Sequence, residues 1–420
     1  MPNVYYAVCP GTGGTSDKKT GSPTITISSG VATLSVAQTG NIGQGFRITY
    51  DTSKVCFISK VNSATSFDVV TATGGTPSNE ASPVTVNSIA ADYASLSAAE
   101  AGASDANHLN TLDLVTATTI LNLVCYAGAS ADATSCNIDG YTASADYYMH
   151  VYAANGGAQS LSINRHSGIW DASKYIITAT GAQRTITLND VYIRVTGLQI
   201  DASPLTHSSS GGLVSYNQDY IDSCIIRDDG GCYVGYGPFG GGPHTIVNSV
   251  IYGFTLSSGY AGIDFYNCTS TSLVYNCTVF SNYRGFWGES GTVHIYNSAF
   301  FNNYDDITTS SSSLTIDYCA SDDNDGTHTQ DLADSAASWN AQFADYDATN
   351  PDVRLVGNSL LLMTGIGPAL DSNVPTTDIV GTSRSGNTCD IGAFEYVASG
   401  GGGVSIIPII MNHLQKMRAN

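Results

Sequence analysis

The sequence predicts an all-β protein built as a parallel β-solenoid, and three observations favour this fold. Only 12% of the 420 residues are charged, while 44 are Gly and 25 are Tyr, a usage typical of short strands joined by tight turns. A short motif recurs at spacings of 26, 26, 28, 21 and 20 residues. Apolar residues recur with period two around each copy, as in half-buried strands. Such a period suits one coil of a solenoid, which stacks on its neighbours to pair its strand edges.

The recurring motif places a polar residue at one corner of most coils. Its six copies begin at Val195, Ile221, Val247, Tyr275, Tyr296 and Ile316. The second position is Thr in the first copy and Asp or Asn in the others, at Asp222, Asn248, Asn276, Asn297 and Asp317. Stacked corner residues of this type hydrogen-bond their own backbone and the next side chain. We therefore expect these five residues to form one structural ladder.

Three elements are expected before the repeats. Residues 1–23 read as the first strand and cap of the solenoid, and residues 24–90 as an inserted β module with alternating, half-buried strands. A short capping helix is expected within 92–103, with Asp92 as its N-cap, lying as a lid on the first coil. The insert is either an attachment module or an elaboration of the cap.

The solenoid is expected to span residues 91–396. Short β runs extend it upstream of the motif, at 118–126, 135–141, 147–153, 175–181 and 184–190. About eight coils then give a rod roughly 40 Å tall. Residues 397–420 read as a Gly-rich linker and an apolar, basic tail. We expect residues 404–420 to dock into a partner or a sister subunit, the alternatives being a disordered end or a return onto the rod.

Charge and cysteine usage exclude several classes of function. The chain carries 15 basic and 35 acidic residues, a formal charge of −20, so it lacks the basic face that a nucleic-acid partner requires. No signal peptide is visible, and the longest apolar run, at 406–411, is too short for membrane insertion. The ten Cys form no CxxC pair, so we expect buried thiols rather than disulfides or a metal site.

Three segments resemble right-handed parallel β-helix proteins of the pectate-lyase-like superfamily. "VYYAVCPGTGGTSDKKTG" (4–21) resembles their opening strand and Gly-rich turn, and "RLVGNSLLLMTGIGPALDSN" (354–373) their closing segment. "CDIGAFEY" (389–396) resembles the terminal motif that finishes the last coil. The resemblance implies a right-handed coil. It leaves the chemistry open, because this fold hosts lyases, hydrolases, adhesins and viral spikes.

With no visible secretion signal, a β module near the N-terminus and few charges, the chain looks like a bacteriophage tail spike, tail fibre or capsid decoration protein. This implies a homo-oligomeric structural protein of the virion, made in the host cytoplasm. Its partners would be other virion proteins, contacted through residues 404–420 or 24–90, and a host-surface glycan. The alternatives are a polysaccharide lyase or glycoside hydrolase that acts on surface glycans, and an extracellular cell-surface adhesin.

Candidate catalytic residues are few. Arg227, Asp228 and Asp229 are candidates, because paired carboxylates beside a base suit glycan cleavage. Further acids follow the motif strands, at Asp305, Asp306, Asp322, Asp323 and Asp325, and stacking could gather them on one edge. The competing interpretation is that all of these are polar turn residues. No cofactor is expected, and Ca²⁺ is the ion that such carboxylates would suit.

Two local groups of residues that contain a Trp each have two interpretations, a functional site or a packing role. Trp287, in "RGFWGESG", either lines a sugar site or packs at a corner. A second cluster holds Arg165, His166, Trp170 and Asp171, and we expect it to pin two coils together rather than to catalyse.

Overall fold

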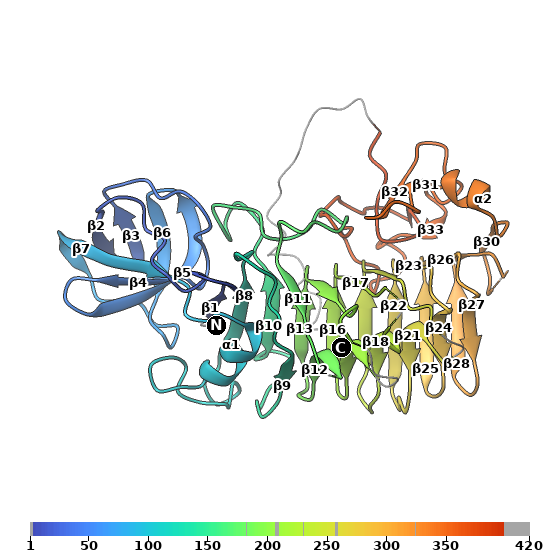
Figure 1. Cartoon of the computed structure of the whole chain (residues 1–420), viewed down its shortest axis with the longest axis horizontal. Helices are drawn as coiled ribbons and strands as arrows, with labels where there is room; N and C mark the ends of the chain where they lie inside the picture. The colour runs from blue at the N-terminus through green and yellow to red at the C-terminus, as the bar shows by residue number, and fades with distance from the viewer. Residues whose placement is uncertain are drawn as a thin grey trace.

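The structure is a computed structural model that describes residues 3–181, 183–205, 210–229, 231–256, 259–323 and 325–398. The expected docking tail at 404–420 lies outside these residues. Most of the described chain winds into a right-handed parallel β-helix with three sheets along its length (Figure 1), which confirms the predicted fold class. In the described residues, no helix is both long and apolar enough to cross a membrane.

The three sheets run the length of the rod. The nine-stranded sheet holds β1 (Asn3–Val8), β8 (Ile120–Cys125), β10 (Met149–Ala153), β13 (Ile193–Thr196), β16 (Asp219–Asp222), β19 (His244–Val247), β22 (Thr271–Tyr275), β25 (Thr292–Tyr296) and β28 (Ser313–Asp317). The eight-stranded sheet holds β11 (Ile176–Thr178), β14 (Gln199–Asp201), β17 (Ile225–Arg227), β20 (Val250–Tyr252), β23 (Thr278–Phe280), β26 (Ala299–Phe301), β29 (Ala320–Ser321) and β30 (Gln330–Asp331). The seven-stranded sheet holds β9 (Cys136–Ile138), β12 (Arg184–Leu188), β15 (Gly211–Ser215), β18 (Val234–Pro238), β21 (Ala261–Phe265), β24 (Arg284–Gly288) and β27 (Asp305–Thr309).

Apolar side chains in equivalent positions fill the rod. In the seven-stranded sheet, one inward file carries Ile186, Leu213, Tyr236, Ile263, Phe286 and Ile307. Because parallel strands stack in register, each coil adds one layer to the same continuous core. All ten cysteines are buried free thiols, as expected from the missing CxxC pairs.

Residues 24–90 fold as a closed antiparallel barrel beside the first coils. Its strands are β2 (Thr24–Ser28), β3 (Val31–Leu34), β4 (Arg47–Tyr50), β5 (Lys54–Ser63), β6 (Ser66–Val70) and β7 (Glu80–Ala90). Tyr126 and Tyr152 of the rod each donate a hydroxyl hydrogen bond to Gln44, at 2.7 and 2.8 Å. The loop of Gly45 also covers the free edge of β1, because the Ala7 N–H donates to the Gly45 carbonyl at 3.1 Å. A barrel loop therefore protects this strand edge.

The N-terminal helix begins later than predicted. Helix α1 spans Leu96–Gly102, and its N-cap is Ser95, whose hydroxyl accepts a hydrogen bond from the Ala98 N–H. The prediction of Asp92 as the cap is wrong. Its carboxylate instead pairs with Arg47 and His108, both at 3.1 Å, so it cannot serve the first turn of the helix. Leu96 joins the main core, which seats the helix on the first coils.

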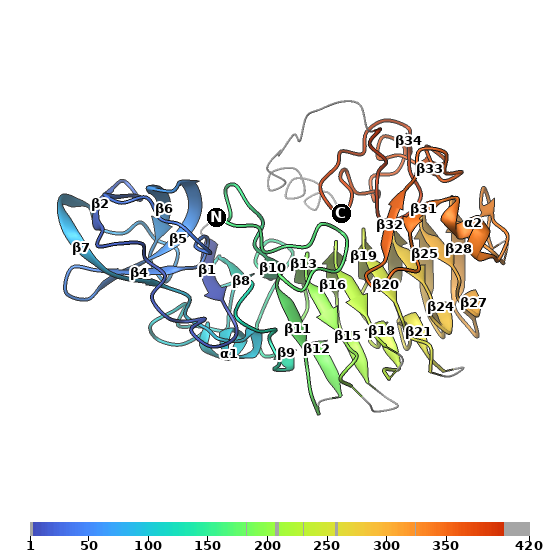
Figure 2. The ribbon, with the colours of Figure 1, turned by 45° about the horizontal axis from the view of Figure 1, so that its top comes forward.

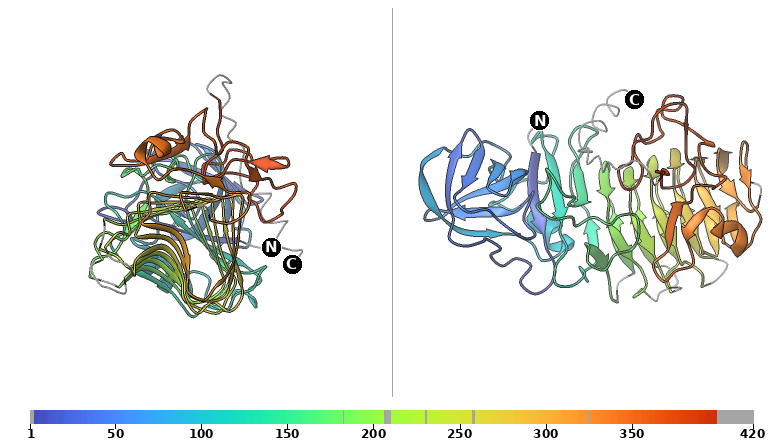
Figure 3. Two further views of the ribbon diagram at one scale, coloured as in Figure 1. Left: turned by 90° about the vertical axis from the view of Figure 1, so that its right-hand side faces the viewer. Right: turned by 90° about the horizontal axis from the view of Figure 1, so that it is seen from above.

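The C-terminal segment 332–396 does not add coils to the rod. It carries α2 (Ala336–Asn340) and two short antiparallel sheets, made of β31 (Phe343–Asp345) with β32 (Asp352–Leu355), and β33 (Gly365–Ile366) with β34 (Thr388–Cys389). We call this segment the arm. Figures 1 and 2 show it running back along the rod, and Figure 3 shows it from the end and from above.

The motif at 389–396 therefore lies on the side of the rod, and the expectation that it finishes the last coil is wrong. Ile391, Ala393 and Phe394 pack against Phe280 and Phe301, two stacked rings of the eight-stranded sheet whose centroids are 5.0 Å apart. Burial of this apolar outer surface explains why the arm returns onto the rod.

The strand register corrects the predicted ladder. Asp222 pairs with Val247, and Asp317 pairs with Tyr296, so both lie one residue before the corner. The corner file itself holds Gly197, Ser223, Asn248, Asn276, Asn297 and Tyr318, all with positive φ. Only the three Asn of the predicted set share this file. Asp222 still contacts it, because Asn248 Nδ2 donates to Asp222 Oδ1 at 3.0 Å.

Candidate functional site

A group of polar and aromatic side chains lies on the outer face of the seven-stranded sheet. Ile263 and Phe286 point into the core, so their neighbours Asp264 and Trp287 point outward. These two residues are paired in register on the adjacent strands β21 and β24. Arg284 begins β24, and its guanidinium carbon lies 3.9 Å from the centre of the Trp287 ring. Asp264, Arg284, Trp287 and the nearby Glu289 are called the outer-face cluster below.

Several polar atoms of this cluster have no hydrogen-bond partner among the described residues. They are Oδ1 of Asp264 and both Nε and Nη1 of Arg284, and all three atoms are buried. Buried polar atoms in proteins are almost always satisfied, so these donors and acceptors call for a further partner, either a bound water or a ligand with hydroxyl or amide groups. The arrangement offers two donors and one acceptor beside an indole ring.

Electrostatics keep the Asp264 carboxyl protonated. Burial, and secondly the negative charge of Glu289, raise the pKa of Asp264 from 3.8 to about 8, although Arg284 opposes the shift. Burial also raises the pKa of Glu289, again against Arg284. At neutral pH the cluster therefore presents one neutral carboxyl group, one acidic group of raised pKa and one guanidinium.

A row of tyrosines borders the outer-face cluster. Each tyrosine of the row directly precedes one of the strands β18, β21, β24 and β27 of the seven-stranded sheet. The four residues are Tyr233, Tyr260, Tyr283 and Tyr304. The rings of Tyr283 and Tyr304 stack with centroids 4.6 Å apart, and Tyr304 is 77% exposed. Tyr233 and Tyr283 are half-buried and Tyr260 is buried, so the exposed aromatic surface of the row is concentrated at Tyr304, a feature that suits an interaction site.

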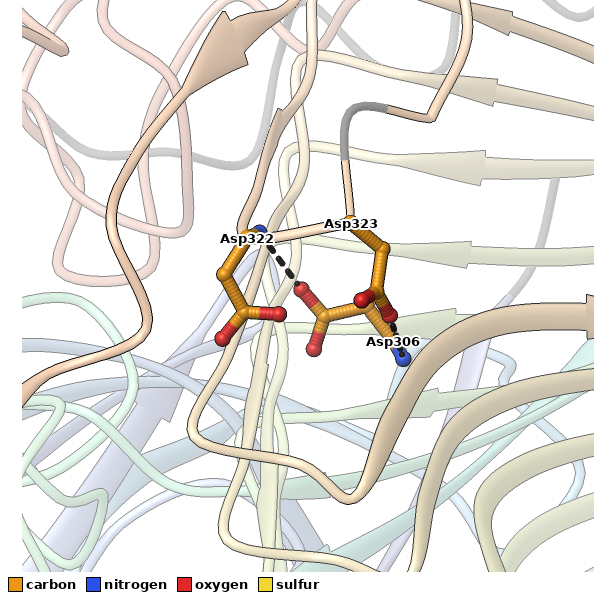
Figure 4. A group of neighbouring side chains, drawn as sticks. All are labelled: Asp306, Asp322 and Asp323. Atoms are coloured by element: carbon orange, nitrogen blue, oxygen red, sulfur yellow. Dashed lines mark hydrogen bonds between the residues drawn. The ribbon is translucent and has the colours of Figure 1, made fainter.

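A separate acidic cluster lies at the far end of the same sheet (Figure 4). Carboxylate oxygens of Asp306, Asp322 and Asp323 all lie within 4.8 Å of one another. The Asp306 N–H donates to Asp323 at 2.9 Å, and the Asp322 N–H donates to Asp306 at 3.0 Å (Figure 4). Asp306 lies in β27, directly before Ile307, and is fully buried. Stacking thus gathers three of the acids that the sequence placed after its motif strands.

The charges of this acidic cluster are only partly compensated by the protein. Burial and then Asp306 raise the pKa of Asp322 to about 8, and burial raises the pKa of Asp306 and that of Asp325, the latter to about 6. Three carboxylates this close need either bound protons or a cation. Oxygen ligands of this kind suit Ca²⁺, so Asp306, Asp322 and Asp323 are the residues that could hold such an ion.

The leading catalytic candidates do not converge on one site. Arg227 forms an ion pair with Asp201 at 3.0 Å and lies 3.7 Å above the Trp170 ring. Asp228 is buried and accepts a hydrogen bond from the Cys232 N–H at 2.8 Å, within its own loop, while Asp229 is exposed. These contacts are those of structural turn residues.

The cluster at 165–171 also contacts distant segments. Arg165 donates to the carbonyl of Ile379 in the arm at 2.8 Å, and the Asp171 N–H donates to Gln199 at 2.7 Å. His166 is buried, and burial lowers its pKa to about 3. The cluster joins the arm and a neighbouring coil, in line with the pinning role expected for it.

The sequence reasoning named Trp287 but missed Asp264, Arg284 and the tyrosine row. The signal that could have found them is Tyr-x-Gly, which occurs at Tyr233, Tyr260 and Tyr283. The glycine faces inward where space is short, since a Cβ on Gly285 would lie 2.8 Å from a ring carbon of Phe300. The Tyr-x-Gly motif marks the start of successive strands in the seven-stranded sheet. The recurring Asn/Asp motif, in contrast, lies at the corner after the nine-stranded sheet.

Comparisons with known proteins identify no family for this chain. No protein-family model matches it, and no curated protein is similar enough to match. Among solved structures, "Crystal structure of pectate lyase Pel9A" is similar with a TM-score of 0.32 and 16% sequence identity, over 73% of this chain and 92% of that chain. A likeness at this level carries no argument about activity, and the fold assignment here rests on the strand pairing.

Proposed function

We propose that this protein is a β-helical rod that binds glycans through the outer-face cluster of its seven-stranded sheet. The observation that carries the proposal is the set of buried, unpartnered polar atoms of Asp264 and Arg284 beside the Trp287 ring. Sugar hydroxyls donate and accept hydrogen bonds, and the apolar face of a sugar ring packs on aromatic rings. A glycan would therefore satisfy both the polar atoms and the exposed aromatic surface.

Glycan binding is tested on an array of host-surface and plant polysaccharide fragments. We expect the protein to bind at least one glycan, and Trp287→Ala and Arg284→Ala each to weaken that binding by about tenfold or more. Leu370→Ala is the control, because this side chain is 65% exposed on the arm and remote from the cluster in sequence. Absence of binding by the unaltered protein, or equal binding by all variants, would refute the proposal.

We further propose that the rod belongs to a bacteriophage particle as a tail spike, tail fibre or capsid decoration. The support comes from the sequence features described above, namely no visible secretion signal, a β module near the N-terminus and few charges. A barrel suited to attachment and a glycan-binding rod suited to the host surface agree with them. Attachment would use residues 24–90 or 404–420, and the assembled form would be a homo-oligomer. The test is mass spectrometry of purified particles, and a protein absent from every particle fraction would rule the assignment out.

Glycoside hydrolysis is a second candidate function, favoured by the raised pKa of Asp264. A carboxyl group that stays protonated near neutral pH, beside a second carboxylate, is the combination that a general acid and its partner require. Asp264 would then donate the proton to the leaving oxygen, with Glu289 as the partner. Release of reducing ends from the bound glycan, lost in Asp264→Asn while binding persists, would establish this activity. Binding without any release would leave the rod as a binding protein.

A further inference from the structure

A second arginine–aromatic pair lies on the same outer face, toward the N-terminal end of the rod. The guanidinium carbon of Arg184 lies 5.3 Å from the centre of the Tyr216 ring, and Arg184 Nε is buried without a hydrogen-bond partner among the described residues. Both side chains line a groove of about 570 Å³, together with Glu100 and Asn189. The pair thus repeats two features of Arg284 and Trp287, the ring contact and the unpartnered Nε.

The strand register relates the two arginines directly. Successive parallel pairs align Arg184 with Gly211, Val234, Ala261 and Arg284. The two guanidinium groups therefore belong to one file, four rungs apart, and rungs about 4.8 Å apart place their backbones about 19 Å from each other. The three residues between them are small or β-branched and are buried, so other side chains form the surface between the two pairs.

An aromatic file connects the two pairs along the other edge of the strands. Tyr216, Phe239 and Tyr266 are the first residues after β15, β18 and β21, and the N–H of each donates to the carbonyl that ends the preceding strand. The rings of Phe239 and Tyr266 meet edge to face with centroids 6.1 Å apart, and Tyr266 is 45% exposed. Aromatic surface thus continues from the Arg184 groove toward Trp287.

We infer that one linear, neutral polysaccharide binds along this face and contacts the Arg184 groove and the outer-face cluster at the same time. This inference rests on the proposed glycan-binding function and adds a second contact point and a class of ligand. A linear chain matches the partly exposed aromatic file of Tyr216, Phe239 and Tyr266, and sugar hydroxyl groups are suitable partners for the guanidinium groups at both ends. Acidic sugars fit poorly, because the carboxyl groups of Glu100 and Asp139 line the groove and that of Glu289 lies near Arg284.

The test uses matched short and long members of linear neutral glycans, first on an array and then by calorimetry. Affinity is expected to rise by about tenfold or more once the chain is long enough to span four rungs, because the second contact becomes intramolecular. Arg184→Ala should remove this gain with length and leave the affinity for short chains unchanged. Arg354→Ala is the matched control, since its side chain is 59% exposed and paired with Asp352 on the arm.

The outcomes separate this inference from the proposed function. Short glycans that bind through Trp287 without any gain from length, or a gain that persists in Arg184→Ala, would overturn the two-point inference and leave the proposed function intact. A preference for acidic glycans would overturn the neutral ligand class. Loss of binding to every glycan in the unaltered protein would remove both proposals together. Circular dichroism of Arg184→Ala would check that the rod remains folded.

Discussion

At the scale of single residues, the corner file explains why Asn recurs on the central coils. Asn248, Asn276 and Asn297 have φ values of 52°, 51° and 52°, a left-handed conformation that Asn adopts at lower cost than most residues. Their side chains also contact the arm. Asn297 accepts from the Ile366 N–H at 2.9 Å and donates to the Ile366 carbonyl at 2.8 Å. The left-handed backbone conformation and the contact with the arm thus both favour Asn at these positions.

Replacing Asn297 by Ala should therefore lower the free energy of unfolding by about 2–4 kcal/mol, since it adds left-handed strain and removes both hydrogen bonds to the Ile366 backbone, whose carbonyl keeps its bond from the Cys389 thiol. Chemical denaturation measures this change. Asn302→Ala is the matched control, because Asn302 has a φ of 52° but is exposed and its side chain donates to Ser281 of the neighbouring coil. It should cost about 1 kcal/mol. Equal effects of the two substitutions would contradict the role assigned to the arm contact.

The sequence could predict the type of corner residue but not its exact position in each coil. Asp222 and Asp317 look like Asn248 in an alignment, because each follows an apolar strand residue. The position in the left-handed region is held by Ser223 and Tyr318 in those coils, and neither residue type marks such a conformation. Spacing alone could not reveal this shift, since the loops between coils differ in length.

At the scale of elements, the loop after β29 covers the open end of the seven-stranded sheet with acidic groups. The pKa of Asp322 rises from 3.8 to about 8 on folding, so the folded chain binds its proton more tightly than the unfolded chain. This contribution to stability is complete below the unfolded pKa and is lost as the pH rises toward 8. We propose that a divalent cation such as Ca²⁺ replaces the proton under alkaline conditions.

We accordingly expect the melting temperature of the protein to fall between pH 4 and pH 8, the window set by the two pKa values of Asp322. Asp322→Asn, which mimics the protonated carboxyl, should flatten this dependence, whereas the exposed control Asp229→Asn should leave it unchanged. Differential scanning calorimetry in the presence of a chelator measures the melting temperature of both variants as a function of pH. Added Ca²⁺ should raise the melting temperature at pH 8 in the unaltered protein more than in Asp322→Asn. Identical pH profiles for all three proteins would refute the role of Asp322.

Regular elements were predictable where a short-range pattern exists, and the arm was not. The strands of the rod and the barrel alternate apolar and polar residues, so their period identified them. The arm has strands of two to four residues and depends on contacts such as the Gly392 N–H with the Asn297 carbonyl at 2.7 Å. No local pattern encodes a contact across 95 residues, so the similar closing motif suggested the end of the rod instead.

At the scale of the whole molecule, the arm changes how the rod holds together. A solenoid is stabilised by contacts between neighbouring coils, and its ends can open separately. The arm bridges coils that do not touch, because Arg384 donates to Asn248 while Gly392 binds Asn297, two coils further along. Arg165 extends this connection toward the N-terminal coils through Ile379. The arm should therefore couple the unfolding of distant coils.

Truncation after residue 331 tests this coupling on the whole rod. The intact protein should unfold in one transition, whereas the truncated protein should unfold in at least two, because the coils then rely on neighbours alone. Urea titrations would be followed by far-UV circular dichroism and by Trp fluorescence. The two unfolding curves should coincide for the intact protein and differ for the truncated protein. Truncation also exposes Phe280 and Phe301, so the experiment needs dilute protein to limit aggregation. Leu370→Ala keeps the arm and should keep a single transition, and coincident probes after truncation would show that stacking alone makes the rod cooperative.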